Sequence, residues 1–242
     1  MYENYNGYEN DNVIQVETGL NSYIVKVFAW MFIGLIATAI SSYGLFRTGL
    51  FMLFMNMPAL IVLAIAEIGL VVYLTSAVAK NSISTLGAKI GFIIYAVING
   101  ITLSSIFIAY DIGLIYQAFL ISALTFGIMA FFGKVTNKDL TKFGSILLMG
   151  LIGVILATLV NMILSFFGLF STKLDIVLSY LTIFIFLGLT AFDVQKIKRF
   201  YYSSQGDMAL ASNLSILGAL TLYLDFINIF IKVLRLLGRN RR

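Results

Sequence analysis

Residues 90–132, IGFIIYAVINGITLSSIFIAYDIGLIYQAFLISALTFGIMAFF, decide the fold class of this chain. In this whole segment the only charged residue is Asp111. A helix that crosses a membrane needs about 20 predominantly apolar residues. The runs 90–110 and 114–132 each have about that length, and only Asp111 to Gly113 separate them. The segment therefore predicts two consecutive membrane-spanning helices joined by a tight connector.

The same composition extends over most of the protein. Its 242 residues are 60% hydrophobic and 11% charged, with a mean hydropathy of +0.99. Soluble domains carry about 25% charged residues, so this chain has too little polar surface for a water-soluble globule. The remaining apolar runs are 22–46, 58–79, 143–167, 174–194 and 212–237. We therefore expect an all-α, polytopic membrane protein with seven transmembrane helices.

The expected domain organisation is one seven-helix domain, residues 21–238, between two short tails. Residues 1–20 form a flexible polar N-terminal tail, because they are rich in Tyr, Asn and acidic residues and lack the basic start of a signal peptide. Residues 239–242 form a basic C-terminal tail. The longest internal loop is expected at about 195–211, and Pro58 suits the first turn of a helix because its missing N–H would be unpaired there.

The absence of certain residue types excludes whole classes of function. The chain has no His and no Cys, which removes His-based zinc sites, Ser-His and Cys-His nucleophiles, iron–sulfur centres and disulfides. We expect neither an enzyme nor a resident cofactor. The net charge of +5 comes from basic residues in short loops and a tail, a pattern typical of contact with anionic lipid rather than nucleic acid.

The distribution of basic residues predicts an orientation. Cytoplasmic connectors carry an excess of Lys and Arg, and an N-terminus in the cytoplasm leaves only Arg47 and Lys173 in the outer connectors. The basic residues then inside are Lys26, Lys80, Lys89, Lys134, Lys138, Lys142, Lys196, Lys198 and Arg199. The composition, rich in Ile, Phe, Asn and Lys, favours a bacterial source and hence the plasma membrane.

The basic C-terminal group conflicts with that orientation. A seventh complete crossing places Lys232, Arg235, Arg239, Arg241 and Arg242 outside. The last helix therefore either crosses against the rule or returns as a re-entrant segment. A crossing is preferred, because about 25 residues suffice to span the bilayer.

Three acidic residues lie within the apolar runs: Glu67, Asp193 and Asp225. An acid at the bilayer centre costs about 2.5–3.5 kcal/mol and indicates a functional site, although an acid that is merely protonated or paired is the structural alternative. Counted from the intervening loop, the depths of Asp193 and Asp225 differ by less than about 10 Å at about 1.5 Å per residue. We expect the two aspartates to face one another.

A polar stripe in the last apolar run supports this placement. Its positions follow one another at steps of three or four, as on one face of a helix: Gly218, Thr221, Asp225, Asn228, Lys232 and Arg235. Exposing such a stripe of polar side chains to lipid would cost free energy. The stripe should line the bundle interior or a water-filled path, which makes the last helix a candidate for the centre of the fold.

Two facing carboxylates have a defined chemistry. At about 4 Å they repel by about 4 kcal/mol at an effective dielectric of 20, so they share a proton, bind a cation or recruit a basic group. Ca²⁺ prefers oxygen ligands but takes six to eight of them. Asp193 and Asp225 therefore predict a weak Ca²⁺ site for permeation or gating, rather than a high-affinity store.

The chain resembles the Bax inhibitor (TMBIM) family. The resemblance rests on LTAFDVQKIK at 189–198, LYLDFINIFIKVLRLLG at 222–238 and NGITLS at 99–104. It implies seven helices with the last one central among the other six, and a pH-sensitive calcium leak channel with Asp193 and Asp225 as the gating pair. Glu67 would be an acid along the ion path, which Asn228 and Thr221 also line.

The resemblance fails at one position of the gate. Members often carry an arginine near the end of the second span that bridges the aspartates, whereas this chain reads SAVAKNS at 76–82. The candidate charge partners are then Lys80 and Lys232. Lysine is a point charge without the bidentate fork of arginine, so the match to a three-part gate is incomplete.

Two other functions remain open. One is a non-transporting scaffold that binds other membrane proteins, in which the acids are structural. The other is an intramembrane aspartyl protease, whose two aspartates also share a proton; LYLD at 222–225 lacks the expected glycines, and Pro58 is the only proline. For the leading hypothesis, a monomeric cation leak, the partners are the lipid bilayer, Ca²⁺ and protons.

Overall fold

The computed structural model describes residues 3–204 and 206–239, with side chains from Glu17 onward. All regular elements of this part of the chain are helical. They are α1 (Glu3–Thr48), the 3-10 helix η1 (Leu50–Phe54), α2 (Met57–Ala79), α3 (Thr85–Leu103), α4 (Ile106–Ala109), α5 (Ile112–Val135), α6 (Thr141–Phe166), α7 (Thr172–Ser203) and α8 (Met208–Arg239).

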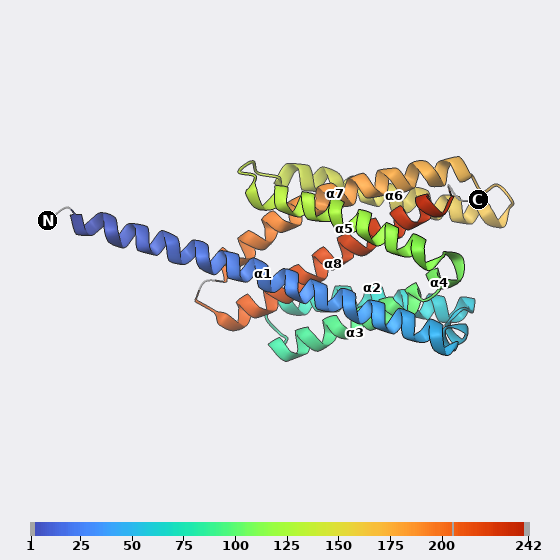
Figure 1. The fold of residues 1–242 in the computed structure, drawn as a ribbon, viewed down its shortest axis with the longest axis horizontal. Coiled ribbons are helices and arrows are strands. Elements are labelled where there is room, and N and C mark those ends of the chain that lie inside the picture. Colours follow the sequence, from blue (N-terminus) through green and yellow to red (C-terminus); the bar gives the residue numbers. More distant parts are fainter. Residues whose placement is uncertain (1–2, 205, 240–242) are drawn as a thin grey trace.

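Seven segments of the described chain are long and apolar enough to cross a membrane, α3 and α4 together forming one of them. Successive spans run in opposite directions, so that α1 begins at one end of the bundle and α8 finishes at the other (Figure 1). The all-α, seven-span prediction is confirmed. We call the end with connectors 80–84 and 136–140, where α7 ends and α8 begins, the amino-terminal side, and the opposite end the carboxyl-terminal side.

The last helix crosses the bundle completely. α8 is a single helix of 32 residues, about 48 Å at about 1.5 Å per residue, which exceeds the hydrocarbon core of about 30 Å. The crossing preferred from the sequence is therefore the arrangement found, and the re-entrant alternative does not fit. The basic end of α8 lies on the carboxyl-terminal side, away from the other basic connectors (Figure 1).

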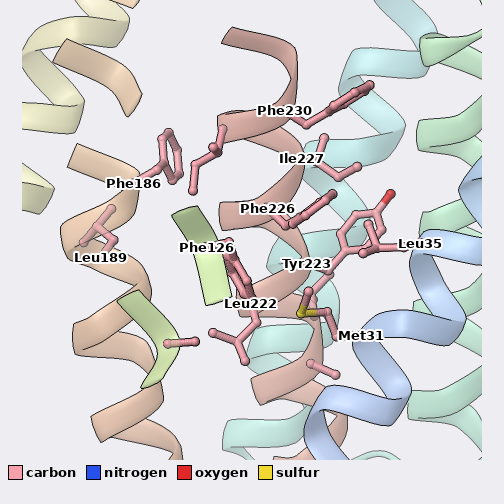
Figure 2. Packing of buried hydrophobic residues seen from close by; sticks show 14 of the residues in the cluster. Met31, Leu35, Phe126, Phe186, Leu189, Leu222, Tyr223, Phe226, Ile227 and Phe230 are labelled. Carbon is pink, nitrogen blue, oxygen red and sulfur yellow. The ribbon is translucent and has the colours of Figure 1, made fainter. Parts of the chain in front are cut away.

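α8 lies at the centre of the bundle. It packs against α1, α2, α3, α5 and α7, and 67% of its 18 most apolar consecutive residues are buried, against 11% for α2. Figure 2 shows Phe226 of α8 with Phe126 of α5 on one side and Leu35 of α1 on the other, and the rings of Phe226 and Phe126 lie 5.7 Å apart. The expected central position is found, except that α6 packs mainly on α7.

The predicted loop at about 195–211 is wrong. α7 continues to Ser203 and α8 begins at Met208, so Lys196, Lys198 and Arg199 lie on the last turns of α7. Hydropathy marked the end of the span at Val194, where the apolar run stops. The backbone remains helical for further turns, and the long basic side chains on these turns can reach the membrane surface.

The predicted tails also differ from the structure. From Glu3 the described part of residues 1–20 is helix continuous with α1, rather than a separate segment. At the other end Arg239 is the last residue of α8. The remaining residues of the predicted basic tail, 240–242, lie outside the described residues.

The third span is interrupted near its end. α3 ends at Leu103 and α4 begins at Ile106. In between, the Ser104 hydroxyl donates to the carbonyl of Ile101 at 2.6 Å, and the Ser105 hydroxyl donates to that of Thr102 at 3.1 Å. Serine hydroxyls that bond to nearby carbonyls compete with regular helix bonding, which accounts for the break.

The start of α2 follows the sequence prediction. Pro58 lies in its first turn, and the Asn56 side chain caps the helix by accepting a hydrogen bond from the Ala59 N–H at 2.9 Å. An Asn cap satisfies one of the N–H groups that a helix start leaves unpaired.

Gly133 of α5 allows two backbones to approach closely. A Cβ at this position would lie 2.3 Å from the carbonyl oxygen of Ala191 on α7. Because that obstacle is backbone, we expect Gly133→Ala to destabilise the protein by about 1–3 kcal/mol, measured as a lower unfolding temperature in detergent. Gly69→Ala is the matched control, since a Cβ on α2 there meets nothing within 4 Å; equal unfolding temperatures for the two variants would contradict this account.

Candidate functional site

The polar stripe of α8 faces a groove between α6 and α7. Thr221, Asp225 and Asn228 line a cavity of about 340 Å³ together with Asp193 of α7 and Leu148 of α6. The spacing of three and four residues places the polar side chains of α8 on this one face. The stripe thus lies toward the interior groove, as its polarity requires.

Asp193 and Asp225 are both buried in the wall of this cavity, with exposed fractions of 7% and 3%. Both aspartates line the same cavity, and the charge of Asp193 acts on Asp225, so the structure brings together the two residues that helix counting placed at similar depth. The Thr190 side chain lies within hydrogen-bonding reach of Asp225. Oδ2 of Asp225 nevertheless has no hydrogen-bond partner among the described atoms.

An unpaired oxygen beside a second carboxylate defines what the pair can do. A buried polar atom without a partner is costly, and two buried carboxylates whose charges interact do not both carry a charge without compensation. A proton or a cation between them removes both penalties. The geometry is therefore suited to exchanging protons or weakly binding a cation.

The basic groups near the pair differ from those expected. Lys196 acts on both aspartates and Arg199 on Asp193, and both residues lie on α7. Lys80 ends α2 as its C-cap, and the charge of Lys232 interacts with Arg235 and Asp175. Neither Lys80 nor Lys232 is among the described groups that act on the pair.

The cavity of the aspartates is the first of a row. A second cavity, about 330 Å³, shares Leu151, Phe186 and Asn228 with it and extends along α8 to Lys232. A third, about 460 Å³, shares Thr158 with the second and reaches the carboxyl-terminal side. We call this row the α6–α8 groove. It is bounded by α6, α7 and the polar stripe of α8.

The far end of the groove contains an ion-pair cluster that was not predicted from the sequence. Asp175, in the first turn of α7, accepts Arg235 at 3.1 Å and Arg239 at 2.9 Å, and only 8% of its side chain is exposed. The cluster lines the third cavity. One signal was available: the stripe ends in Arg235, which needs a counter-charge, and Asp175 is the acid at the matching end of the preceding span.

Glu67 belongs to a different polar cluster. The Thr102 hydroxyl of α3 donates to its Oε1 at 2.7 Å, and Asn99 also hydrogen-bonds to it. Asn99 accepts the Tyr223 hydroxyl of α8 at 3.0 Å, and Tyr223 is hydrogen-bonded to Thr38 of α1 at 2.6 Å. Glu67 lines none of the three cavities of the α6–α8 groove, so the predicted acid lies beyond α8 from the aspartates.

The amino-terminal side of the groove is held in place by Gln195, next but one to Asp193. Its Oε1 accepts the Leu140 N–H at 2.9 Å, and its Nε2 donates to the carbonyl of Lys138 at 2.8 Å. In the same connector, hydrogen bonds from the Thr141 hydroxyl and N–H hold the pKa of Asp139 below its usual range. These contacts tie the α5–α6 connector to the helix that carries Asp193.

Among the described residues no group of three or more His, Cys, Asp or Glu could hold a metal ion. The aspartate pair therefore supplies fewer oxygens than the six to eight that Ca²⁺ takes.

Comparison with known proteins identifies relatives over nearly the whole length of the chain. A family model described as inhibitor of apoptosis-promoting Bax1 matches residues 20–242. The inner membrane protein YbhL of Escherichia coli K12 is 41% identical over 237 residues, which cover 96% of this chain and 97% of that protein. A membrane protein of Streptococcus pyogenes serotype M1 is 38% identical over 96% of this chain and 99% of its own length. A protein of Borreliella burgdorferi is 40% identical over 91% of this chain and 93% of its own length.

Proposed function

This chain belongs to the Bax inhibitor family of membrane proteins, and on that basis we propose that it is a pH-sensitive channel through which cations, Ca²⁺ in particular, leak across the membrane. The α6–α8 groove is the ion path, and Asp193 and Asp225 form its gate. The family is one of membrane proteins and not a known enzyme family, and the proposed function requires no catalytic step.

One observation carries the proposal. The two buried aspartates lie at one end of a row of cavities that runs along the polar stripe of α8 to the opposite side of the bundle. Acidic residues within a membrane-spanning segment cost free energy, and only 11% of the residues of this chain are charged, so two buried acids on the same cavity indicate a function. Thr221 and Asn228 add polar atoms to the same wall.

The gate works by proton exchange. At neutral pH the pair holds one proton, which binds a carboxylic acid on one helix to a carboxylate on the other. Acidification adds a second proton, which removes the charge that strengthens this hydrogen bond and frees α7 from α8. Flux therefore rises as pH falls. Glu67, linked to α8 through Asn99 and Tyr223, acts on the path from the other face of that helix.

The proposed setting is the bacterial plasma membrane, with the N-terminus in the cytoplasm and a single chain as the working unit. In this orientation the aspartate pair is nearer to the cytoplasm and the Asp175 cluster lies on the outer side. Protons from the cytoplasm then reach the gate past Lys196 and Arg199, which lie on the last turns of α7.

The test is Ca²⁺ flux into proteoliposomes between pH 8 and pH 5, with empty liposomes as the baseline. We expect flux above that baseline that rises on acidification. Leu151→Trp fills the α6–α8 groove, because Leu151 lines two of its cavities, and should reduce flux to the baseline. Ile152→Trp is the matched control, since Ile152 is 59% exposed on the same helix.

Two results would overturn the proposal. If wild-type flux equals that of empty liposomes at every pH, the protein is not a leak channel and a scaffold role fits better. If Leu151→Trp conducts as well as Ile152→Trp, ions do not pass along the α6–α8 groove.

A further inference from the structure

A second groove lies on the other side of α8, between α1 and α5. Its larger part is a cavity of about 730 Å³ lined by Phe28, Met31, Phe119 and Gly127, with Phe226 of α8 as its floor. A smaller cavity of about 270 Å³ continues it and shares Leu35, Phe119 and Phe226. We call the larger cavity alone the α1–α5 groove. Figure 2 shows the rings of Phe226 and Phe126 where α8 meets α5.

The groove is apolar along its length and basic at one end. Its lining is aliphatic and aromatic except for Lys134, which lies in the last turn of α5 on the amino-terminal side. Lys198 of α7 donates its ammonium hydrogen to the carbonyl of Lys134, and the two lysine charges act on one another. The ion pairs found in the described chain include neither lysine.

We propose that the α1–α5 groove binds one phospholipid with an anionic headgroup, its acyl chain between α1 and α5 and its phosphate at Lys134 and Lys198. Two adjacent cations without an acidic partner favour an anion, and Lys and Arg near a membrane surface attract anionic lipids. The apolar lining suits a hydrocarbon chain and offers nothing to a polar ligand.

The dimensions agree with one leaflet. From Lys134 to Phe119 along α5 is about 22 Å at about 1.5 Å per residue. Half of the hydrocarbon core is about 15 Å, so the groove spans one leaflet and its interface. The proposal does not depend on ion conduction, because this groove and the aspartate pair lie on different faces of α8.

Gly127 provides the decisive substitution. A Cβ at Gly127 meets nothing within 4 Å, so Gly127→Leu fills the groove without disturbing the helix packing. Gly153→Leu is the matched control, because Gly153 of α6 is equally open but lines neither groove. Ala123→Phe, also in the groove, provides a second test if Gly127→Leu does not fold, which its unfolding temperature will show.

The measurement is native mass spectrometry of the full-length protein in detergent, titrated with phosphatidylglycerol or phosphatidylcholine of identical chains. We expect one phosphatidylglycerol per chain. Gly127→Leu should weaken its binding about tenfold, as follows from displacing about two methylene groups from apolar surroundings. Lys134→Gln should weaken phosphatidylglycerol binding about fivefold, the contribution of one lysine near an anionic surface, and leave phosphatidylcholine binding unchanged.

Either of two outcomes overturns the proposal. If Gly127→Leu and Ala123→Phe bind as much phosphatidylglycerol as Gly153→Leu, the lipid does not occupy the groove. If the wild type binds both lipids equally, the lysines do not recognise the headgroup.

Discussion

Asp225→Asn is expected to reduce the rise in Ca²⁺ flux on acidification. The side-chain amide retains the shape of the acid and donates a hydrogen bond to Asp193, but it carries no exchangeable acid proton, so the pair no longer shares one and Asp193 alone is left to titrate. A hydrogen bond to a charged group contributes about 1.5–3 kcal/mol. The variant should therefore conduct about tenfold less than the wild type at pH 5, while both conduct little at pH 8.

Asp111→Asn is the control for this experiment. Asp111 is exposed on the opposite side of the bundle from the aspartate pair and makes no capping hydrogen bond, so its removal should leave the pH dependence of flux intact. The unfolding temperature of Asp225→Asn should not fall, because the amide has the size of the acid, keeps a hydrogen bond to Asp193 and introduces no buried charge. A pH profile identical to that of the wild type would exclude Asp225 from the gate.

Asp175→Asn is expected to give the largest loss of stability among single polar substitutions. Removing one member of a buried ion pair costs about 3–5 kcal/mol. The side chains of Arg235 and Arg239 remain 40% and 28% exposed, so water compensates in part, and we expect a loss of about 1–3 kcal/mol.

Thermal unfolding in detergent measures this loss, with Asp111→Asn as the control. Asp111 is an exposed acid on the same side of the bundle, and its side chain makes no capping hydrogen bond. The difference should persist in high salt, because Asp175 itself is buried. An additive effect of Asp175→Asn and Arg239→Gln would show that the two residues do not interact.

The sequence was sufficient to predict the span count, the stripe of α8 and the meeting of Asp193 with Asp225. These depend on apolar run length and helical periodicity, which are local properties. Asp175 was not predicted as a site residue because it lies at a helix end, where charged residues are common. Its burial depends on contacts with α8, which is distant in the sequence. The partners of Glu67 likewise come from α3 and, through Tyr223, from α8 and α1.

The Asp175 cluster also bears on the basic end of α8. Arg235 and Arg239 conflict with the distribution of positive charge when counted as loop residues. In the structure both bind a buried acid of the same bundle, so their charge is partly neutralised within the protein. A rule based on sequence position does not take this pairing into account.

The attachment of α6 has a mechanical consequence. This helix packs mainly on α7, so the α6–α8 groove is open between α6 and α8, where a bilayer would place acyl chains. The bilayer is therefore part of the wall of the proposed conduit. In the proposed channel, changes in membrane thickness or lateral tension would act on the distance between α6 and α8, and lipid composition would influence the leak alongside proton concentration.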